Sequence, residues 1–451
     1  MRTTPGVLAV SAAVLAAVAI AAGPAQAASA GSLDPSFGTG GVVTVPAGFG
    51  PGTMLTQSDG TILVQGTETN ATTGDAEFAI MSYNANGTVD TSFGTDGLAV
   101  ASFSGVSAEP SSIFVQPDGN IVVAGTEEGN IALAEFNANG TLDTSFGSGG
   151  EVTALFPSGN ASLPGTDSVN AVLVDANGNI LVGGGLVTCS NPKNAECMSD
   201  TALALFSPDG TLDTSFGNGG SAVQRVAGSN GVIALGEDSA GDIFVQNDDP
   251  LAGNTIGAGG GITIGEFSPA GVPDSTVTFP SSSSITISST DGFQPNGTYP
   301  VGQMVQEDVA GKTTYDVQVL LDSLPAGAAS ASFSNAPFAY ASGDTANTIT
   351  GSPFAGSNGD VAVDGSTCAT FRHGVCQNGQ PSLALLTPTG SLDSAFGTDG
   401  VITIPVSSSG STDIESPTIQ PDGNILVPME NFSTNAQGIT TTTATIDRFL
   451  G

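Results

Sequence analysis

The sequence has very few of the residues on which common kinds of binding and catalysis depend. It contains no tryptophan, one histidine and six lysine or arginine residues against 42 acidic residues, for a net charge of -36. A single histidine cannot supply the usual ligands of a zinc enzyme, and the lack of tryptophan weakens sugar or quinone binding by indole stacking. The strong negative charge repels phosphate backbones and anionic headgroups, which excludes nucleic acids and membrane surfaces as partners.

Long apolar runs are also missing, except at the N-terminus. A basic start precedes an apolar run at residues 7–22 and an Ala-x-Ala sequence that ends at Ala27. This pattern is typical of a cleaved secretory signal peptide, and the run is too short to span a membrane. We expect cleavage after Ala27, which removes residues 1–27, with cleavage after Ala30 as the alternative. The mature chain would then be secreted or associated with the cell envelope. An uncleaved anchor is the alternative.

The four cysteines form two close pairs, Cys189 with Cys197 and Cys368 with Cys376. Outside the cytoplasm an even number of cysteines is typical of disulfides. Each bond would close a short loop, which stabilises the fold by about 2–3 kcal/mol at most and fixes the shape of that loop. A metal site is the alternative, but seven intervening residues are not a typical zinc spacing.

The strongest pattern that is present is an internal repeat of about 60 residues. A motif that reads LDPSFG at residues 33–38 returns four times and interleaves with a second motif, QPDGNIVVAG at residues 116–125. The other copies of the first motif begin at Val89, Leu142, Leu212 and Leu392, and relatives of the second begin at Gln57, Asp175, Asp238, Ser357 and Gln420, with a weak copy at Val309.

These motifs resemble the bacterial delta-60 repeat family over nearly the whole mature chain. The resemblance is weak between residues 280 and 356. It implies a β-propeller-like repeat fold. It implies no catalytic residues, because that family is defined by its repeat and has no shared activity.

Each repeat predicts four short strands, A to D. In the second repeat these are residues 113–115, 121–124, 131–136 and 152–155, joined by Asp-Gly and Asn-Gly turns that suit tight hairpins. Strand B is apolar on both faces, which fits a sheet covered on both sides by its neighbours. We therefore expect an all-β fold, a β-propeller of four-stranded blades. The recurring Phe and Asp of the first motif are expected to be structural, with Phe wedged between blades and Asp accepting backbone hydrogen bonds.

The two ends of the chain predict how the propeller closes. The mature chain starts with a D-type segment, residues 33–45, and stops after a C-type segment, residues 441–449. The N-terminal strand would then complete the last blade and remove its open edge. Counting A–B hairpins gives seven blades in a single domain, residues 28–451. Six or eight blades are the alternatives, because the divergent residues 281–352 could hold a small inserted domain.

Function is expected in the B–C loops, which vary in length while the other turns do not, and which should share one face. These loops span residues 67–77, 125–130, 186–201, 247–261, 364–381 and 430–440. The cysteine pairs would fix two of them. Drift of unconstrained loops is the alternative interpretation.

The candidate binding residues in these loops are Asp248, Asp249, Asp364, Arg372, His373 and Glu430. Calcium is the possible cofactor, because it prefers oxygen ligands, and Asp248 and Asp249 are its first candidate ligands. No EF-hand pattern is present, so solvated surface acids are the alternative. For His373 an exposed loop histidine is the alternative to a catalytic role, and no Gly-x-Ser-x-Gly sequence frames a nucleophile.

Two functions are compatible with these features. The first is a secreted, monomeric, non-catalytic propeller that binds a protein or glycan through its B–C face. The second is a hydrolase or lyase that uses carboxylates at the mouth of the pore with a divalent cation. An enzyme of that kind would gather acids from several blades at the pore, whereas a binding module would place an exposed apolar or aromatic patch there. A purely structural envelope protein would show neither.

Overall fold

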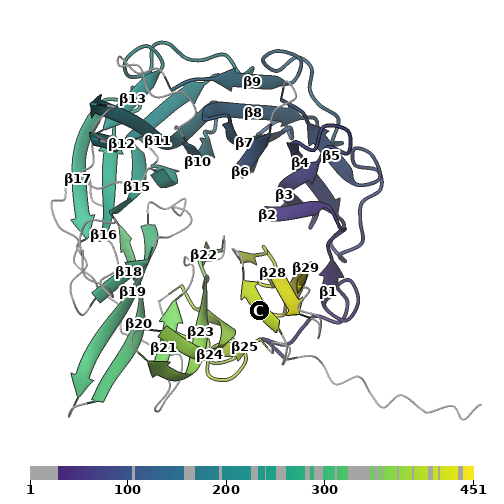
Figure 1. Cartoon of the computed structure of the whole chain (residues 1–451), viewed down its shortest axis with the longest axis vertical. Helices are drawn as coiled ribbons and strands as arrows, with labels where there is room; N and C mark the ends of the chain where they lie inside the picture. The colour runs from purple at the N-terminus through teal and green to yellow at the C-terminus, as the bar shows by residue number, and fades with distance from the viewer. Residues whose placement is uncertain are drawn as a thin grey trace, which may run out of the picture.

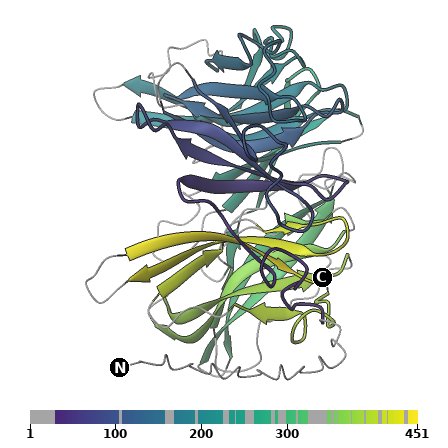
Figure 2. The ribbon, with the colours of Figure 1, turned by 90° about the vertical axis from the view of Figure 1, so that its right-hand side faces the viewer.

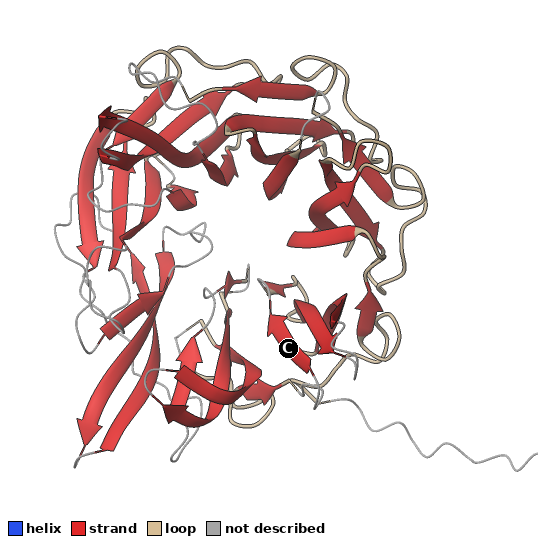
Figure 3. Cartoon of the chain, in the orientation of Figure 1, coloured by secondary structure: helices blue, strands red, loops and turns tan. Residues whose placement is uncertain are grey.

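The protein is an all-β chain in its described parts. The computed structural model describes residues 29–103, 107–156, 168–191, 196–224, 232–238, 240–249, 261–279, 285–288, 298–309, 312–323, 346–349, 354–356, 359–372, 375–388, 391–404, 410–414, 417–434 and 440–451. All regular structure in these residues is β-strand (Figure 3). No described segment is a helix of the length and apolarity that crossing a membrane requires.

Four antiparallel sheets of four strands each follow one another along the chain. Their strands are β2 (Phe49–Thr56), β3 (Ile62–Thr69), β4 (Ala76–Tyr83) and β5 (Leu98–Ala101); β6 (Ala108–Val115), β7 (Ile121–Glu127), β8 (Asn130–Phe136) and β9 (Glu151–Ala154); β10 (Ser168–Val174), β11 (Ile180–Asn191), β12 (Glu196–Phe206) and β13 (Ser221–Gln224); and β14 (Val232–Glu237), β15 (Ile243–Asp249), β16 (Gly261–Phe267) and β17 (Pro273–Phe279). Each sheet reproduces the predicted order A to D.

Three more sheets complete the described strands. They contain β18 (Ile285–Ser288), β19 (Thr298–Val309) and β20 (Lys312–Ser323); β21 (Ala346–Ile349), β22 (Phe354–Ala355), β23 (Val361–Arg372), β24 (Val375–Leu386) and β25 (Val401–Thr403); and β26 (Gly410–Ile414), β27 (Thr418–Ile419), β28 (Ile425–Thr434), β29 (Thr440–Phe449) and β1 (Val42–Thr44). The sheets succeed one another around a common centre, and the strands labelled β2, β6, β10 and β22 lie innermost (Figure 1).

The hydrophobic core lies between neighbouring sheets. In one cluster Phe78 and Ile80 of β4 pack with Ile121 and Val123 of β7. Ile121, Val122 and Val123 are all fully buried, so successive side chains on both faces of β7 are covered, as the sequence of strand B predicts. Each such side chain stabilises the fold by about 1.5–3 kcal/mol, and this burial holds the sheets together.

The longest expected loops are not loops. Residues 186–191 and 196–201 continue the ladder between β11 and β12, and most of residues 364–381 continues the ladder between β23 and β24. A hairpin that continues a ladder pairs backbone groups that a loop would leave to other partners. The expectation of variable loops at 186–201 and 364–381 is therefore corrected to long β-hairpins, whose tips at residues 192–195 and 373–374 lie outside the described residues.

The LDPSFG-type motif joins five of the seven described sheets to the next. Its Phe is buried in all five copies, and its Asp accepts the backbone N–H two residues later. Its Gly donates its N–H to a backbone carbonyl of the following sheet. These bonds are Gly38 to Asn86 (2.8 Å), Gly94 to Asn139 (2.8 Å), Gly147 to Asp209 (2.9 Å), Gly217 to Ala270 (2.8 Å) and Gly397 to Ala30 (3.1 Å). The structural roles predicted for this Phe and Asp are confirmed.

The N-terminal segment lies against the C-terminal strand. β1 pairs with β29 in the last sheet, and the purple and yellow ribbons lie side by side in Figures 1 and 2. Backbone hydrogen bonds extend the contact in both directions, from Gly31 N to Leu450 O at 2.6 Å and from Val45 N to Ala444 O at 3.0 Å. The N-terminal segment therefore supplies the outer strand of the sheet that the C-terminal strands form, as the segment types at the two chain ends predict.

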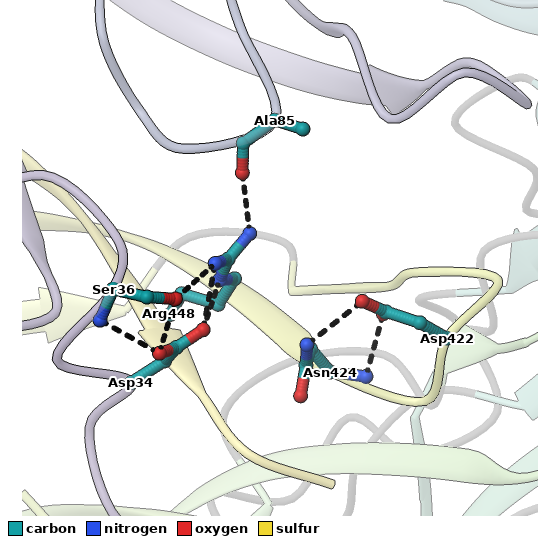
Figure 4. Close-up of polar contacts among 6 residues, drawn as sticks. All are labelled: Asp34, Ser36, Ala85, Asp422, Asn424 and Arg448. Atoms are coloured by element: carbon teal, nitrogen blue, oxygen red, sulfur yellow. Dashed lines mark hydrogen bonds and ion pairs between the residues drawn. The ribbon is translucent and has the colours of Figure 1, made fainter.

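An ion pair fixes this junction (Figure 4). Arg448 Nη2 lies 2.6 Å from Asp34 Oδ2, and both side chains are 9% exposed. The guanidinium also donates to the carbonyl of Ala85 at 2.6 Å and lies 4.5 Å from the ring centre of Phe37. Burial raises the pKa of Asp34, but hydrogen bonds from Ser36 and Arg448 outweigh it and hold the pKa below its usual value. The carboxylate therefore stays charged opposite the arginine.

The contact between an LDPSFG-type motif and the sheet that follows it can be tested at Gly140, whose φ is +80°. A Cβ there would lie 2.7 Å from Gly94 N and 2.8 Å from the ring of Phe93. We predict that Gly140→Ala lowers the free energy of unfolding by about 2–4 kcal/mol, from backbone strain and overpacking together. Gly149→Ala is the matched control, because Gly149 has a φ of +74° but nothing within 4 Å of its Cβ position. It should cost only about 1 kcal/mol. Equal losses in urea unfolding would contradict this account of the contact.

Candidate functional site

A cavity of about 450 Å³ lies among the innermost strands; we call it the central cavity. It is lined by residues of β2, β6, β10, β14, β22 and β27, and so by six of the seven described sheets. The lining residues are Thr53, Met54, Ser111, Ser112, Ile113, Phe114, Asn170, Ala171, Val172, Ala234, Leu235, Phe354 and Thr418. None of them is charged. This volume falls within the range of about 300–1,000 Å³ that is typical of small-molecule sites.

The polar part of the lining comes from β-bulges. The register between innermost and second strand shifts at the same place in four sheets, next to the fourth and fifth residues of the second strand. The extra residues include Thr53, Ser111 and Asn170, all of which line the central cavity. A bulge re-aims a side chain relative to the regular pleat. The recurring bulge therefore places a Thr, Ser or Asn in the lining of the central cavity in three successive sheets.

A glycine on the second strand lies against the bulge in three of these four sheets. A Cβ at Gly125 would collide with the carbonyl oxygen of Glu109, and Gly66 and Gly184 stand at the equivalent positions of β3 and β11 with equivalent collisions. In these three sheets a larger residue would push the innermost strand away. The glycine recurs after the apolar run of strand B in the first three repeats, but Asn247 takes its place in β15, so the pattern alone does not identify the bulge. The residues Thr53, Ser111 and Asn170 were missed for that reason.

Hydrogen bonds tie the bulges to neighbouring strands. Thr53 N donates to Oε1 of the buried Gln65 at 3.2 Å, and Thr53 Oγ1 donates to the carbonyl of Ser111 in the next sheet at 3.4 Å. Farther round, Val169 N donates to Thr126 Oγ1 at 2.9 Å. The second and third of these bonds join neighbouring sheets, and together the three bonds hold the lining in place. A preformed wall of this kind binds a ligand with little loss of conformational entropy.

The binding residues predicted from the sequence are Asp248 and Asp249 at the end of β15, Asp364 and Arg372 in β23, Glu430 in β28, and His373, which lies outside the described residues. Only Asp364 and Glu430 have described side chains, and neither lines the central cavity. The strands that carry the described residues belong to three different sheets. Asp364 is only 3% exposed and Glu430 is half-buried, so neither is a free loop carboxylate.

The calcium site stays a prediction. Within the described part of the chain, no three His, Cys, Asp or Glu side chains lie close enough together to hold a metal ion. The side chains of its first candidate ligands, Asp248 and Asp249, lie outside the described part. The donors that do line the central cavity are hydroxyl and amide groups, and calcium sites also contain carboxylates.

The backbone register distinguishes the two cysteine pairs. Cys189 is directly opposite Cys197 on the β11–β12 ladder, whereas Cys368 is opposite Gly379 and Cys376 is opposite Phe371. Directly opposed residues have Cβ atoms about 4.5–5.5 Å apart, close to the spacing that a disulfide needs. The register favours the first predicted disulfide and does not bring the second pair face to face. The side chains of all four cysteines lie outside the described residues, so both bonds stay predictions.

Glu135 is the ionisable group in the described residues whose environment is most unusual for a carboxylate. It lies on β8, is 4% exposed, and accepts a hydrogen bond from Asn120 Nδ2 at 2.9 Å. Burial raises its pKa to about 7, with Asp143 and Asp118 adding to the increase and Asn120 opposing it. A shifted pKa is a common sign of a catalytic group. Glu135 is not among the residues that line the central cavity, however, and we interpret it as a structural carboxyl that is neutral in acid.

The shift makes stability depend on pH. Because the folded pKa lies above the value of 4.5 for a free glutamate, the contribution of Glu135 is complete below pH 4.5 and is lost as the pH rises through about 7. We predict that, between about pH 5 and pH 8, the free energy of unfolding of the wild type falls by about 2–3 kcal/mol relative to that of Glu135→Gln. Glu109→Gln, an equal charge change at an exposed site, is the control and should track wild type. Parallel pH profiles for wild type and Glu135→Gln, measured by urea unfolding, would rule this out.

Comparisons with known proteins agree with the repeat. A family model described as a domain of unknown function (DUF5122) beta-propeller matches residues 57–93, 116–146 and 198–216. These matches support a β-propeller repeat, and the resemblance to the delta-60 family stays a prediction. No curated protein matches the chain.

Similar folds occur among solved structures at low identity. The beta-propeller domain of the Trilobed protease from Pyrococcus furiosus is 10% identical, with 89% of this chain and 94% of that chain covered and a TM-score of 0.41. The polysaccharide lyase Uly1 is 10% identical, with 90% and 91% covered and a TM-score of 0.45. The acylaminoacyl peptidase of Pyrococcus horikoshii is 10% identical, with 86% of this chain but only 51% of that chain covered and a TM-score of 0.44.

Proposed function

We propose that this chain is a secreted, non-catalytic β-propeller that binds a small ligand in its central cavity. The observation that carries the proposal is the chemistry of the described lining residues, which offer hydroxyl, amide, aromatic and aliphatic groups and include no charged side chain. General acid–base and metal-assisted hydrolysis both need ionisable or metal-binding groups within reach of the reacting atoms. A lining without them fits binding better than turnover.

The scaffold we propose is a ring of seven blades closed by the N-terminal strand. Seven described sheets, the pairing of β1 with β29 and the ion pair between Asp34 and Arg448 support it. In this arrangement β18, β19 and β20 belong to the fifth blade rather than to an inserted domain. A closed ring fixes the distances between the innermost strands, and a binding site built from six of them depends on those distances.

We further propose that the mature protein is monomeric and extracellular, that residues 1–27 are removed, and that each of the two cysteine pairs forms a disulfide. The site differs from the expected B–C face. Two of the candidate B–C loops are long hairpins, and Asp364, one of the candidate residues, is buried in a strand. The central cavity is the better-defined place for a ligand.

The alternative is a hydrolase or lyase with a divalent cation, and a turnover experiment separates the two. We predict that the purified protein is retained on at least one of three immobilised polymers (cellulose, pectate or gelatin) and releases no reducing ends, unsaturated sugars or free amines, with or without millimolar calcium. Product that scales with protein concentration would overturn the non-catalytic assignment. Failure to be retained on any of the three would count against a binding function.

A further inference from the structure

We infer that the central cavity is built for a neutral, polyhydroxylated ligand, a sugar unit of an uncharged glycan. This inference rests on the proposed function and names the chemistry of its ligand. Three observations support it: the accessibility of the individual lining residues, the charge of those residues and the size of the cavity.

Accessibility divides the lining into two sets. Six aliphatic residues are at most 8% exposed, so a ligand meets little of them; they are Met54, Ile113, Ala171, Val172, Ala234 and Leu235. The more accessible residues are five polar and two aromatic ones, namely Thr53, Ser111, Ser112, Asn170, Thr418, Phe114 and Phe354. The surface that a ligand would touch is therefore richer in hydroxyl and amide groups than the full lining suggests.

The accessible polar groups can form hydrogen bonds with the uncharged hydroxyl groups of a ligand. A hydroxyl both donates and accepts, and an amide offers two donors and an acceptor. Thr53 Oγ1 and Ser111 Oγ each donate to a backbone carbonyl, at 3.4 and 3.3 Å, which leaves their lone pairs able to accept from a ligand hydroxyl. Asn170 is exposed at the third bulge. A ligand with hydroxyls around its edge can use all three bulges.

Two phenylalanines complete this chemistry. Phe114 lies on β6 and Phe354 on β22, and both are half-buried. The face of an aromatic ring carries negative charge density and attracts weakly positive C–H groups. A sugar ring has hydroxyls at its edge and a C–H face, so it matches a wall of hydroxyls and aromatic rings. A purely apolar ligand would leave the bulge groups without partners and would bind less well.

Charge and size restrict the ligand further. Among the described residues the lining has no cation to pair with a carboxylate or sulfate, and the net charge of -36 repels anions from the whole molecule. A buried ligand charge without a partner is costly. The volume of about 450 Å³ admits one or a few sugar units and no folded protein. A neutral saccharide is the class that satisfies all three conditions.

The test measures binding of matched neutral and anionic oligosaccharides to the purified protein by isothermal titration calorimetry. The probes are the hexamers of cellulose, mannan and starch on one side and oligogalacturonate on the other. We expect at least one neutral hexamer to bind more tightly than oligogalacturonate. Asn170→Leu should weaken that binding about tenfold, or about 1.4 kcal/mol, because a ligand hydroxyl loses its partner.

Asn177→Leu is the matched control, since Asn177 is an exposed residue on the turn after the same strand, β10, and does not line the cavity. It should bind like wild type. Thr53→Val, which removes one hydroxyl at nearly constant volume, is the second variant and guards against misfolding of the first. The inference fails if oligogalacturonate binds at least as well, if Asn170→Leu and Thr53→Val both bind like wild type, or if no hexamer binds. Retention on gelatin alone, without saccharide binding, would sink this inference and leave the proposed binding function standing.

Discussion

The contact between the two ends of the chain is the constraint on which the rest of the structure depends. Five junctions between neighbouring sheets share the same buried Phe and the same backbone bond, and the last sheet receives its outer strand from residues 42–44. Arg448 and Asp34 secure that strand, and Arg448 is one of only six basic residues in the sequence. The central cavity depends on the same junction, because six sheets contribute to its lining.

The position of Arg448 within its strand shows how a repeat is adapted for this task. Arg448 and Glu135 each precede the last Phe of their strand and face the Asp of an LDPSFG-type motif. In the second sheet Asn120 bridges the carboxylates of Glu135 and Asp143, and burial raises the pKa of Glu135. In the last sheet a guanidinium replaces that arrangement and pairs with Asp34 directly. Opposite charges at the one junction that joins the chain ends add an attraction that the other repeats do not need.

The sequence predicts the repeating part of the fold well and the lining of the proposed ligand site poorly, for a physical reason. Strands such as β7 follow from local patterns, an apolar run after an Asp-Gly turn, and the exchange of the N-terminal strand follows from counting segment types at the ends. The long hairpins were missed because polar residues near Cys189 and Cys368 are typical of loops as well as of exposed strands. The lining was missed because it depends on bulges and on the meeting of six strands from different repeats. No local pattern shows which side chains face a common centre.

A double-mutant cycle on the chain-end ion pair tests the central claim most directly. Arg448→Met alone should lower the free energy of unfolding by about 3 kcal/mol, because it leaves Asp34 buried without its partner. Adding Asp34→Asn should restore part of that loss, with a coupling above about 1 kcal/mol, and amide exchange at Val43 should quicken in the single variant. Additive losses, together with unchanged exchange at Val43, would contradict the account that this pair holds the N-terminal strand in the last sheet.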